Sequence, residues 1–449
     1  MDLGFETIGN ATLICHDKGP VLATDPWIEG SAYFGSWVTS HEIPAEQREN
    51  VARSKYLWIS HGHPDHLSLA SLEHLRDKTI LLPDHYGGHL GGRVANDLRT
   101  QGFSVRVLPD GVWTPLSDRL RVCSIADFQQ DAILLADLGG KLLVNTNDAS
   151  DHGAGGFVRE TVARYPTSFL LCLTGYGDAD MIHFFDEDGR FLPPPAMGHE
   201  PFLDGIEAIL GAFGIRYFVP FSSLHKYQRT DSAWANACVT PGEAYVGRFQ
   251  SSDRELLPPF CRFDLARMEA TPIGPRRRPE VLHAPEEFGD RWSDELEPAD
   301  VEKIRRYFGA FEHLKTFLGF VRFRVGGKEH VIDVNPRERA RGITFETPRS
   351  SLMTAIEYEV FDDILIGNFA KTTLHGDWHA RGTEALYPDF APFIGKYGDN
   401  GRARTAAELS AYFAEYRRRG FLHFRETAAT PEQLARIRAT KRAVERYLP

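Results

Sequence analysis

Residues 57–66 read Leu-Trp-Ile-Ser-His-Gly-His-Pro-Asp-His, an apolar run followed at once by four side chains that bind metal ions. Side chains two apart on a strand point to the same side, so His61 and His63 can close on one cation. Asp65 and His66 lie where the chain turns toward a helix, and they can face a second cation. A histidine-rich surface loop is the alternative, but four such ligands rarely coincide at this spacing. The run therefore predicts a two-metal site on a loop that a rigid strand holds in place.

The composition predicts an ordinary soluble protein. Its 449 residues suffice for one large domain and a smaller one. Hydrophobic residues make up 42% and charged residues 25% of the chain. No apolar run approaches the roughly 18 residues that cross a bilayer, and the net charge of −11 argues against a nucleic-acid partner. We therefore expect no membrane or nucleic-acid partner, but a small-molecule substrate.

The cysteines and the first residues of the sequence indicate the cytoplasm. The five cysteines are scattered, odd in number and mostly within apolar, strand-like runs. Such cysteines are typical of buried thiols in a reducing compartment, and no pair has iron–sulfur or zinc-ribbon spacing. The first residues lack the basic head and apolar run of a signal peptide.

Short strand-like runs open the chain. Residues 3–9 and 11–16 alternate in the manner of strands, and residues 21–24 form another strand that ends at Asp25. An acid at a strand end beside a metal site can hold a ligand in place by hydrogen bonding. We therefore predict that Asp25 supports a metal ligand from behind.

The His-x-His-x-Asp-His run resembles the signature of the metallo-β-lactamase superfamily. That resemblance implies an α/β fold, namely an αββα sandwich with a two-metal site at its mouth, and further ligands later in the chain. Asp148 matches the aspartate that bridges both metals, and His225, just past a late strand, matches the last ligand. His199 competes for that last role, but it follows a run of prolines and fits no strand end. The superfamily is far wider than the lactamases, so the motif indicates the scaffold more firmly than the reaction.

One position departs from the pattern of the hydrolytic members. They carry a histidine about twenty residues before the bridging aspartate. This sequence has Asp127 there, and it has no histidine between His89 and His152. The set that the resemblance implies is His61, His63 and Asp127 for one metal, Asp65, His66 and His225 for the other, and Asp148 between them.

This ligand set favours iron over zinc. A third carboxylate makes the site more anionic and harder, which suits iron or manganese and stabilises the higher oxidation states of oxygen activation. Zinc hydrolases instead use neutral histidines, which leave the metal electron-poor and able to acidify water. We therefore predict two iron ions as the cofactor and O2 as the co-substrate, with two Zn2+ ions as the alternative.

A carboxylate at this position is similar to that of the di-iron oxygenases built on the same scaffold. They include the β-hydroxylase of chloramphenicol biosynthesis and the terpenoid hydroxylase of platensimycin and platencin biosynthesis. Residues 145–148 and 219–223 also resemble the lactamase-like part of CMP-N-acetylneuraminate hydroxylase, although this sequence has no Cys-x-His pair for that family's Rieske domain. The match covers roughly the first 250 residues. It implies a natural-product-type substrate linked to a carrier, coenzyme A or a nucleotide.

Two other stretches are candidates for substrate binding. Tyr176 and Asp178 lie in a polar loop after a strand, where the acids can equally be solvated or cap a helix. Arg276, Arg277 and Arg278 lie in a proline-containing stretch. A three-arginine run is usually a solvated surface, but arginine suits a phosphate-bearing substrate handle.

The sequence pattern changes in the last third of the chain. We expect a catalytic domain over residues 1–265, a Pro- and Arg-containing linker over 266–299, and an α+β accessory module over 300–449. Apolar residues at helical spacing predict one helix over 301–318 and another over 352–364. The module shows no ligand cluster of its own, so we expect it at most to cover the site or to bind substrate.

These inferences favour an oxygen-dependent di-iron monooxygenase that hydroxylates a small molecule. A separate reductase would supply electrons, because no flavin, nicotinamide or iron–sulfur motif is evident. The alternative is a dizinc hydrolase of a phosphodiester, lactone or acyl bond. That alternative gains if Asp127 points away from the metals and another residue, such as His152, completes the first site. A binding protein without turnover is least favoured, because such proteins usually lose ligands.

Overall fold

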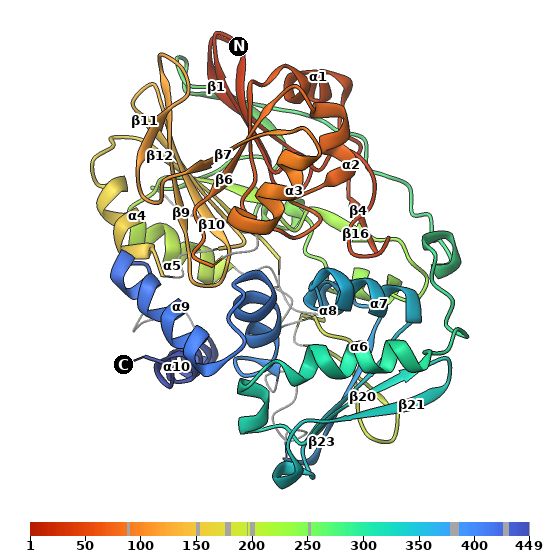
Figure 1. The fold of residues 1–449 in the computed structure, drawn as a ribbon. Helices are drawn as coiled ribbons and strands as arrows, with labels where there is room; N and C mark the ends of the chain where they lie inside the picture. The colour runs from red at the N-terminus through yellow and green to blue at the C-terminus, as the bar shows by residue number, and fades with distance from the viewer. Residues whose placement is uncertain are drawn as a thin grey trace.

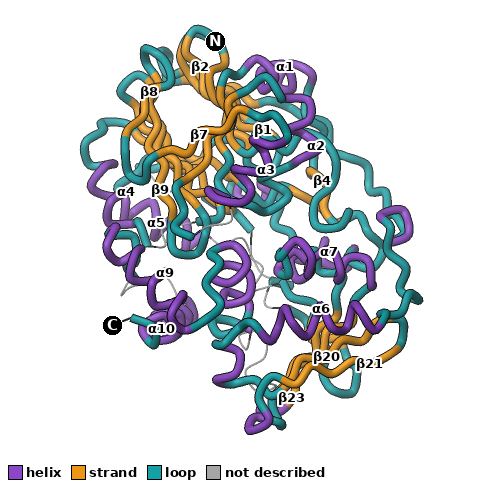
Figure 2. The backbone as a smooth tube through the Cα atoms, viewed as in Figure 1, coloured by secondary structure: helices purple, strands orange, loops and turns teal. Residues whose placement is uncertain are grey.

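The structure is a computed structural model that describes residues 1–87, 90–149, 153–175, 181–194, 196–197, 203–249, 253–377, 386–424 and 431–448. Within these ranges the chain forms a sandwich of two β-sheets and a separate third sheet (Figures 1 and 2). The first sheet has eight strands, in the order β19 (Glu269–Pro272), β18 (Cys261–Asp264), β1 (Leu3–Ile8), β2 (Thr12–Asp17), β3 (Pro20–Thr24), β5 (Tyr56–Trp58), β6 (Thr79–Pro83) and β7 (Ser104–Leu108). The second has seven, in the order β17 (Glu255–Leu256), β15 (Tyr217–Phe221), β12 (Ser168–Leu173), β11 (Lys141–Asn147), β10 (Ala132–Leu138), β9 (Leu120–Ala126) and β8 (Trp113–Pro115).

The two sheets face each other across an apolar core, and β9 shows how the sequence specifies this. Alternate side chains of a strand point to opposite faces, and this strand is apolar on both. Leu120 and Val122 belong to the core between the sheets, together with Phe5 of the first sheet. Cys123 and Ile125 belong to the core under the helices on the other side. The second sheet is therefore buried on both faces.

Helices cover the outer face of each sheet. On the first sheet they are α1 (Ala45–Arg53), α2 (Leu69–Leu72) and α3 (Ala95–Thr100), which share a core with β2, β5 and β6. On the second sheet they are α4 (Gly155–Val162) and α5 (Leu203–Phe213). The predicted αββα sandwich is confirmed.

The third sheet lies apart from the sandwich, at the bottom of Figure 1. Its six strands follow the order β14 (Phe191–Leu192), β13 (Phe184–Phe185), β23 (Lys371–His375), β22 (Gly342–Glu346), β20 (Phe320–Val325) and β21 (Lys328–Asp333). Helices α6 (Pro298–Gly309), α7 (Arg349–Tyr358) and α8 (Asp362–Ile366) lie between this sheet and the sandwich (Figure 1). Residue 184 pairs with residue 372 in parallel, so a segment of the first half of the chain joins the sheet of the second half.

The C-terminal part also packs directly on the sandwich. Helix α9 (Ala406–Arg419) places Tyr412, Phe413 and Tyr416 in the core outside the second sheet, and α10 (Pro431–Glu445) adds Ala443 and Val444. The domain boundaries inferred from the sequence stay a prediction. In the structure the two parts share both a sheet and a hydrophobic core.

The two long helices predicted in the C-terminal part are both interrupted. The helix expected over 301–318 ends at Gly309, and a 3-10 turn follows at His313–Thr316. The helix expected over 352–364 divides at Glu359, whose φ of 59° ends α7 before α8 begins. The apolar positions stay buried because both pieces of each helix pack on one core. The second interruption places Asp362 at the start of α8.

Two predictions about the whole chain can be compared with the structure. All five cysteines lie in described ranges, and they are buried and form no disulfide, as expected. In the described part of the chain, no helix has both the length and the hydropathy to span a bilayer.

Candidate metal centre

The loop that follows β5 carries the first four predicted ligands in two pairs. Nε2 of His61 and Nδ1 of His63 lie 2.8 Å apart. Nε2 of His66 lies 3.3 Å from Oδ2 of Asp65. All four side chains are at least half-buried, and three are fully buried. The structure thus brings together the two pairs that the sequence analysis assigned to two cations.

Asp148, which directly follows β11, lies close to a histidine of each pair. Its Oδ2 is 3.3 Å from Nε2 of His66 and 3.8 Å from Nε2 of His61. Ser222, which follows β15, donates a hydrogen bond of 2.5 Å to the other oxygen, Oδ1. One carboxylate oxygen of Asp148 is therefore near a histidine of each pair, which is the position that a bridging ligand needs.

His225 comes from the second sheet's side of the site, at the start of β16 (His225–Tyr227), which pairs with β4 (Trp37–Thr39). Its ring stacks on that of Trp37, with centroids 3.4 Å apart. Both ring nitrogens are buried and have no hydrogen-bond partner among the residues that the structure describes. His225, His63, Asp65 and Asp148 line one cavity of about 110 Å³. A buried imidazole without a partner is costly, and a metal ion in this cavity would satisfy it.

A second layer of side chains contacts the candidate ligands through ion pairs and hydrogen bonds. Asp25 is fully buried, and its Oδ2 lies 3.2 Å from Nδ1 of His66, while its Oδ1 accepts from the backbone N–H of Ser60. Asp65 accepts from the hydroxyl of Tyr33 at 2.6 Å and from the amide of Asn10 at 2.8 Å. Such partners fix the orientation of metal ligands. Asp25 thus lies beside His66, and its supporting role stays a prediction.

The protonation states of the site suit a cation. Burial disfavours the imidazolium of His66, but the adjacent charges of Asp65 and Asp148 raise its pKa well above the usual value. Burial lowers the pKa of His61 well below its usual value, and burial lowers that of His225 to about 4. His61 and His225 are thus held as the neutral imidazoles that bind metal, whereas a cation beside Asp65 and Asp148 would have to displace a proton of His66.

Several residues around the site have backbone conformations that side chains rarely adopt. The φ angles are 39° for Asp25, 29° for Asn147, 57° for Ser222 and 56° for Ser223. Residues held in such conformations persist only where the surrounding structure enforces them, and they cluster at functional sites. Each lies at the end of a strand that carries or supports a ligand.

Asp127, the carboxylate predicted to bind metal with His61 and His63, directly follows β9 and is fully buried. Its side chain bonds to the backbone of its own loop. Its Oδ1 accepts from the backbone N–H groups of Gln129 and Asp131, at 2.8 and 3.2 Å. Its Oδ2 has no hydrogen-bond partner in the described part of the chain. Burial, together with the charge of Asp131, raises the pKa of Asp127 well above its usual value. No hydrogen bond or ion pair joins Asp127 to a histidine of the site among the described residues.

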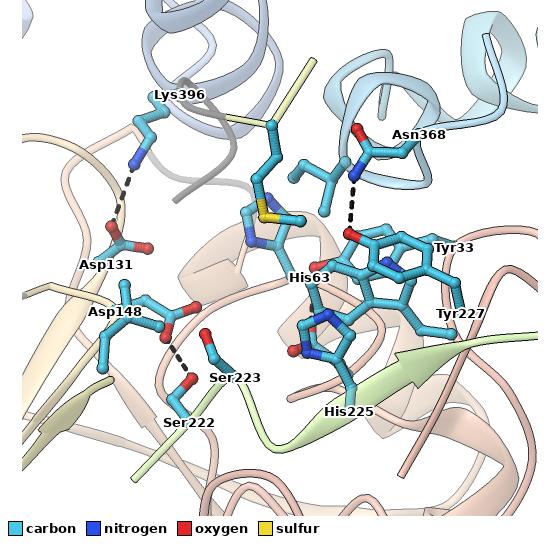
Figure 3. Close-up of a pocket in the computed structure, with 15 residues that line it drawn as sticks. Tyr33, His63, Asp131, Asp148, Ser222, Ser223, His225, Tyr227, Asn368 and Lys396 are labelled. Atoms are coloured by element: carbon cyan, nitrogen blue, oxygen red, sulfur yellow. Dashed lines mark hydrogen bonds and ion pairs between the residues drawn. The ribbon is translucent and has the colours of Figure 1, made fainter. Parts of the chain in front are cut away.

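Asp131, four residues later, is the acid that this loop turns toward the cavity (Figure 3). Its Oδ1 lies 3.9 Å from Nδ1 of His61, and its Oδ2 lies 3.2 Å from Nζ of Lys396. The sequence analysis did not single out Asp131. The signal was present, because a second acid follows Asp127 in the same short turn between β9 and β10.

The C-terminal part supplies further side chains that sequence reasoning missed. Oδ2 of Asp362 lies 3.3 Å from Nε2 of His63, and Asp363 completes a cluster with them whose ligand atoms all lie within 4.8 Å of one another. Burial opposes the charged form of His63, but the hydrogen bond to Asp362 raises its pKa to about 9. Lys396 and Asn368 also line the cavity (Figure 3). The predicted covering role of this part stays a prediction, but its residues do reach the site.

The remaining candidates have varied positions. Tyr176 and Asp178, like His152 and His199, lie outside the described residues. Arg276 pairs with Glu42 at 3.0 Å, and Arg278 donates to the hydroxyl of Thr39 at 3.0 Å. Arg277 lines a second cavity of about 600 Å³. This cavity shares Ser223, His225 and Tyr227 with the metal cavity, so the two lie on either side of one short segment.

The fold and the site together define a class of protein. Two facing mixed sheets carry helices on both outer faces, and the His-x-His-x-Asp-His loop meets Asp148 and His225 where strands of the second sheet end. This is the metallo-β-lactamase fold with a candidate metal site, as the resemblance implied.

In sequence the chain is similar to CMP-N-acetylneuraminic acid hydroxylases. It is 32% identical to that of Danio rerio over 132 residues, which are 28% of this chain and 22% of the relative. It is 27% identical to that of Macaca mulatta over 201 residues, which are 42% of this chain and 32% of the relative. The chain thus spans less than a third of the length of these relatives. No family model matches the chain.

The solved structures to which the chain is similar include enzymes of two kinds. CmlA, a diiron β-hydroxylase from Streptomyces venezuelae, is 14% identical, with a TM-score of 0.33 over 53% of this chain and 47% of that one. An isothiocyanate hydrolase from Delia radicum gut bacteria is 16% identical, with a TM-score of 0.38 over 60% of this chain and 98% of that one.

Proposed function

We propose that this chain is a di-iron monooxygenase that hydroxylates a small molecule. The observation that carries the proposal is the acidity around the first histidine pair. Asp148 and Asp131 lie 3.8 and 3.9 Å from His61, and Asp362 lies 3.3 Å from His63. Asp148 lies on the side of the facing nitrogens of His61 and His63, where a carboxylate ligand suits iron better than zinc. Asp131 and Asp362 lie at the outer nitrogens of these rings, where a carboxylate raises the basicity of a histidine ligand. The sequence similarity to hydroxylases supports the same conclusion.

The ligands proposed are those that the structure gathers. His61 and His63 would hold one ion with a carboxylate from the loop 127–131, and Asp65, His66 and His225 would hold the other, with Asp148 shared. Two iron ions would supply the activation of O2. The protein supplies burial, because His61, Asp65 and His66 have exposed fractions of 2% or less. Such a closed site keeps water away from a reactive oxidant.

The proposed reaction requires two electrons from an external donor, because the sequence shows no evident motif for a flavin, a nicotinamide or an iron–sulfur cluster. Hydroxylation of a C–H bond by O2 consumes two electrons and two protons, places one oxygen atom in the product and releases the other as water. We therefore propose a separate reductase as the electron donor.

The second cavity suggests how a substrate handle would bind. A volume of about 600 Å³ fits a small molecule. Arg277 and Lys226 give part of its wall a positive charge, although Glu243 and Glu280 also line it. This fits a phosphate-bearing nucleotide or coenzyme A handle. Calorimetric titration of CMP and of coenzyme A into the wild type and Arg277→Glu tests this. Binding of either that the charge reversal weakens supports it, and equal binding to both proteins contradicts it.

The experiment that tests the reaction class is metal analysis of protein from cells grown with both iron and zinc, followed by an optical spectrum in air. About two irons per chain with a near-ultraviolet oxo-bridged ferric band support the monooxygenase. Two zincs and a featureless spectrum contradict it.

A second candidate function is a dizinc hydrolase, and the placement of Asp127 favours it. The carboxylate of Asp127 accepts hydrogen bonds from its own loop, so it is not free to act as a third carboxylate ligand. Without that ligand the preference of the site for iron over zinc is weaker. Turnover of a phosphodiester or lactone by the zinc-loaded protein without oxygen would establish this alternative.

A further inference from the structure

We infer that Asp362, from the C-terminal part, is a positioning residue for the metal ligand His63, so that metal binding and docking of α8 depend on each other. The inference rests on the metal centre of the proposed function. It extends that function by making a carboxylate some 300 residues away in sequence part of the site's construction.

The first step is the geometry of the His63 ring. Its Nδ1 faces Nε2 of His61 at 2.8 Å, and its Nε2 faces Oδ2 of Asp362 at 3.3 Å. A carboxylate can only accept, so the hydrogen bond places a proton on Nε2, and in the singly protonated ring the lone pair of Nδ1 is left for a cation shared with His61. A carboxylate behind a histidine in this way fixes its tautomer and ring orientation.

The second step is the anchoring of Asp362. The residue before it, Phe361, is buried in the core of the third sheet. The backbone N–H of Phe361 donates to Oδ2 of Asp399 at 3.2 Å, and Asp399 also accepts from Tyr307 at 2.5 Å and Arg404 at 2.8 Å. The start of α8 is therefore fixed to the C-terminal core and cannot adjust freely toward His63.

The third step is the space left for this carboxylate. Gly395 lies in the π-helical segment Pro392–Asn400, against Asp362. A Cβ at residue 395 would lie 2.5 Å from Oδ2 and 2.7 Å from Cγ of Asp362. Only glycine leaves the carboxylate in its present place, so Gly395 and His63 together enclose it. A π-helical turn is an uncommon element that often accompanies functional sites.

The consequence is reciprocal coupling. If the hydrogen bond from His63 to Asp362 favours the metal-binding form, metal bound at His63 must equally favour the docked position of α8. The C-terminal part would then stabilise the centre directly, in addition to covering it.

Titration with Co2+ as the probe metal tests the inference, because its visible absorption reports each site without turnover. The variants are Asp362→Ala and Gly395→Ala; the second keeps the carboxylate but displaces it. We expect each to weaken one of the two Co2+ sites about 10–100-fold and to leave the other unchanged. We expect Asp362→Asn, which keeps an accepting oxygen, to be intermediate.

The matched control is Asp300→Asn. Asp300 lies in the same part of the chain and accepts from Arg349 at 2.7 Å, but it does not contact the site. We expect it to lower stability and to keep both Co2+ affinities. If Asp362→Ala and Gly395→Ala both bound Co2+ with wild-type affinities, this inference would be wrong, but the metal centre of the proposed function would stand. This holds even if the two variants unfold more easily. Failure of the wild type to bind two Co2+ ions would instead overturn the metal centre of the proposed function.

Discussion

The rings of Trp37 and His225 stack face to face, with centroids 3.4 Å apart and an angle of 3° between their planes. Trp37 lies on β4 and His225 on β16, and the pairing of these strands sets the two rings against each other. The ring nitrogens of His225 have no hydrogen-bond partner in the described part of the chain. The stacked tryptophan is therefore the main contact that orients this ligand.

Trp37→Ala should weaken one metal site. An aromatic pair contributes about 0.5–1.5 kcal/mol beyond area burial, so we expect an affinity about 2- to 13-fold lower at the site of His225. Dialysis against graded chelator, followed by metal analysis, measures this. Trp37→Phe, which can still stack, is the control and should retain most of the affinity. If the alanine variant held metal as tightly as the wild type, stacking would not orient the ligand.

Asp25→Ala should weaken the site of His66. The carboxylate lies 3.2 Å from Nδ1 of His66 and fixes the tautomer that presents Nε2 to Asp65 and Asp148. We expect a loss of affinity of about 10–100-fold, measured by competition with a chelator. Asp110→Ala serves as the comparison, because Asp110 is a half-buried acid that accepts from the backbone N–H of Ala126. If Asp25→Ala bound metal as tightly as Asp110→Ala, Asp25 would not support the ligand His66.

Asp127→Asn and Asp131→Asn distinguish the two acids of one loop. Asp127 caps the loop through its Oδ1, whereas Asp131 lines the metal cavity. We expect Asp131→Asn to lose more metal from the His61 site, and Asp127→Asn to retain two ions because its amide oxygen can still cap the loop. Asp127→Ala should lower the free energy of unfolding by about 1–3 kcal/mol, because two buried N–H groups lose their acceptor. Metal analysis and urea unfolding are the measurements. Loss of iron in Asp127→Asn alone would identify Asp127 as the ligand.

Glu6 should make stability depend on pH in acid. Burial opposes its charged form, but the imidazole of His16 at 3.7 Å and hydrogen bonds from Arg262 and Asn50 hold its pKa at about 2, below the usual 4.5. The native state therefore binds its proton less readily than the unfolded state does. The contribution of Glu6 is fully present above pH 4.5 and is lost as the pH falls toward 2.

Glu6→Gln should remove this part of the pH dependence. We expect it to lower the free energy of unfolding by about 1.5–3 kcal/mol at neutral pH and by less at pH 3. Urea unfolding at both pH values measures the difference. Glu46→Gln removes the other, largely exposed partner of Arg262 and should change stability little. A destabilisation by Glu6→Gln that is the same at both pH values would contradict the assignment.

The sequence by itself determined the features that depend on neighbouring residues. The four candidate ligands lie within residues 61–66, and their spacing predicted that His61 and His63 converge. Both lie in the loop after β5 and not on a strand, so the loop brings them together. Alternation of apolar residues predicted the strands of the sandwich. The positions of Asp148 and His225 followed from the resemblance of the motif to a known scaffold, and the structure places both beside the first four ligands.

Only the tertiary structure decided which distant side chains complete the site. Asp362 meets His63 across 299 positions of sequence, and Lys396 meets Asp131 across 265. Asp362 and Asp363 stand in the first turn of α8, where acids are common because they favour the positive end of the helix dipole. Their local pattern is thus that of an ordinary helix start. Their role depends on how the third sheet's core docks α8 against the sandwich, and a contact between segments so far apart leaves no periodic signal in either one.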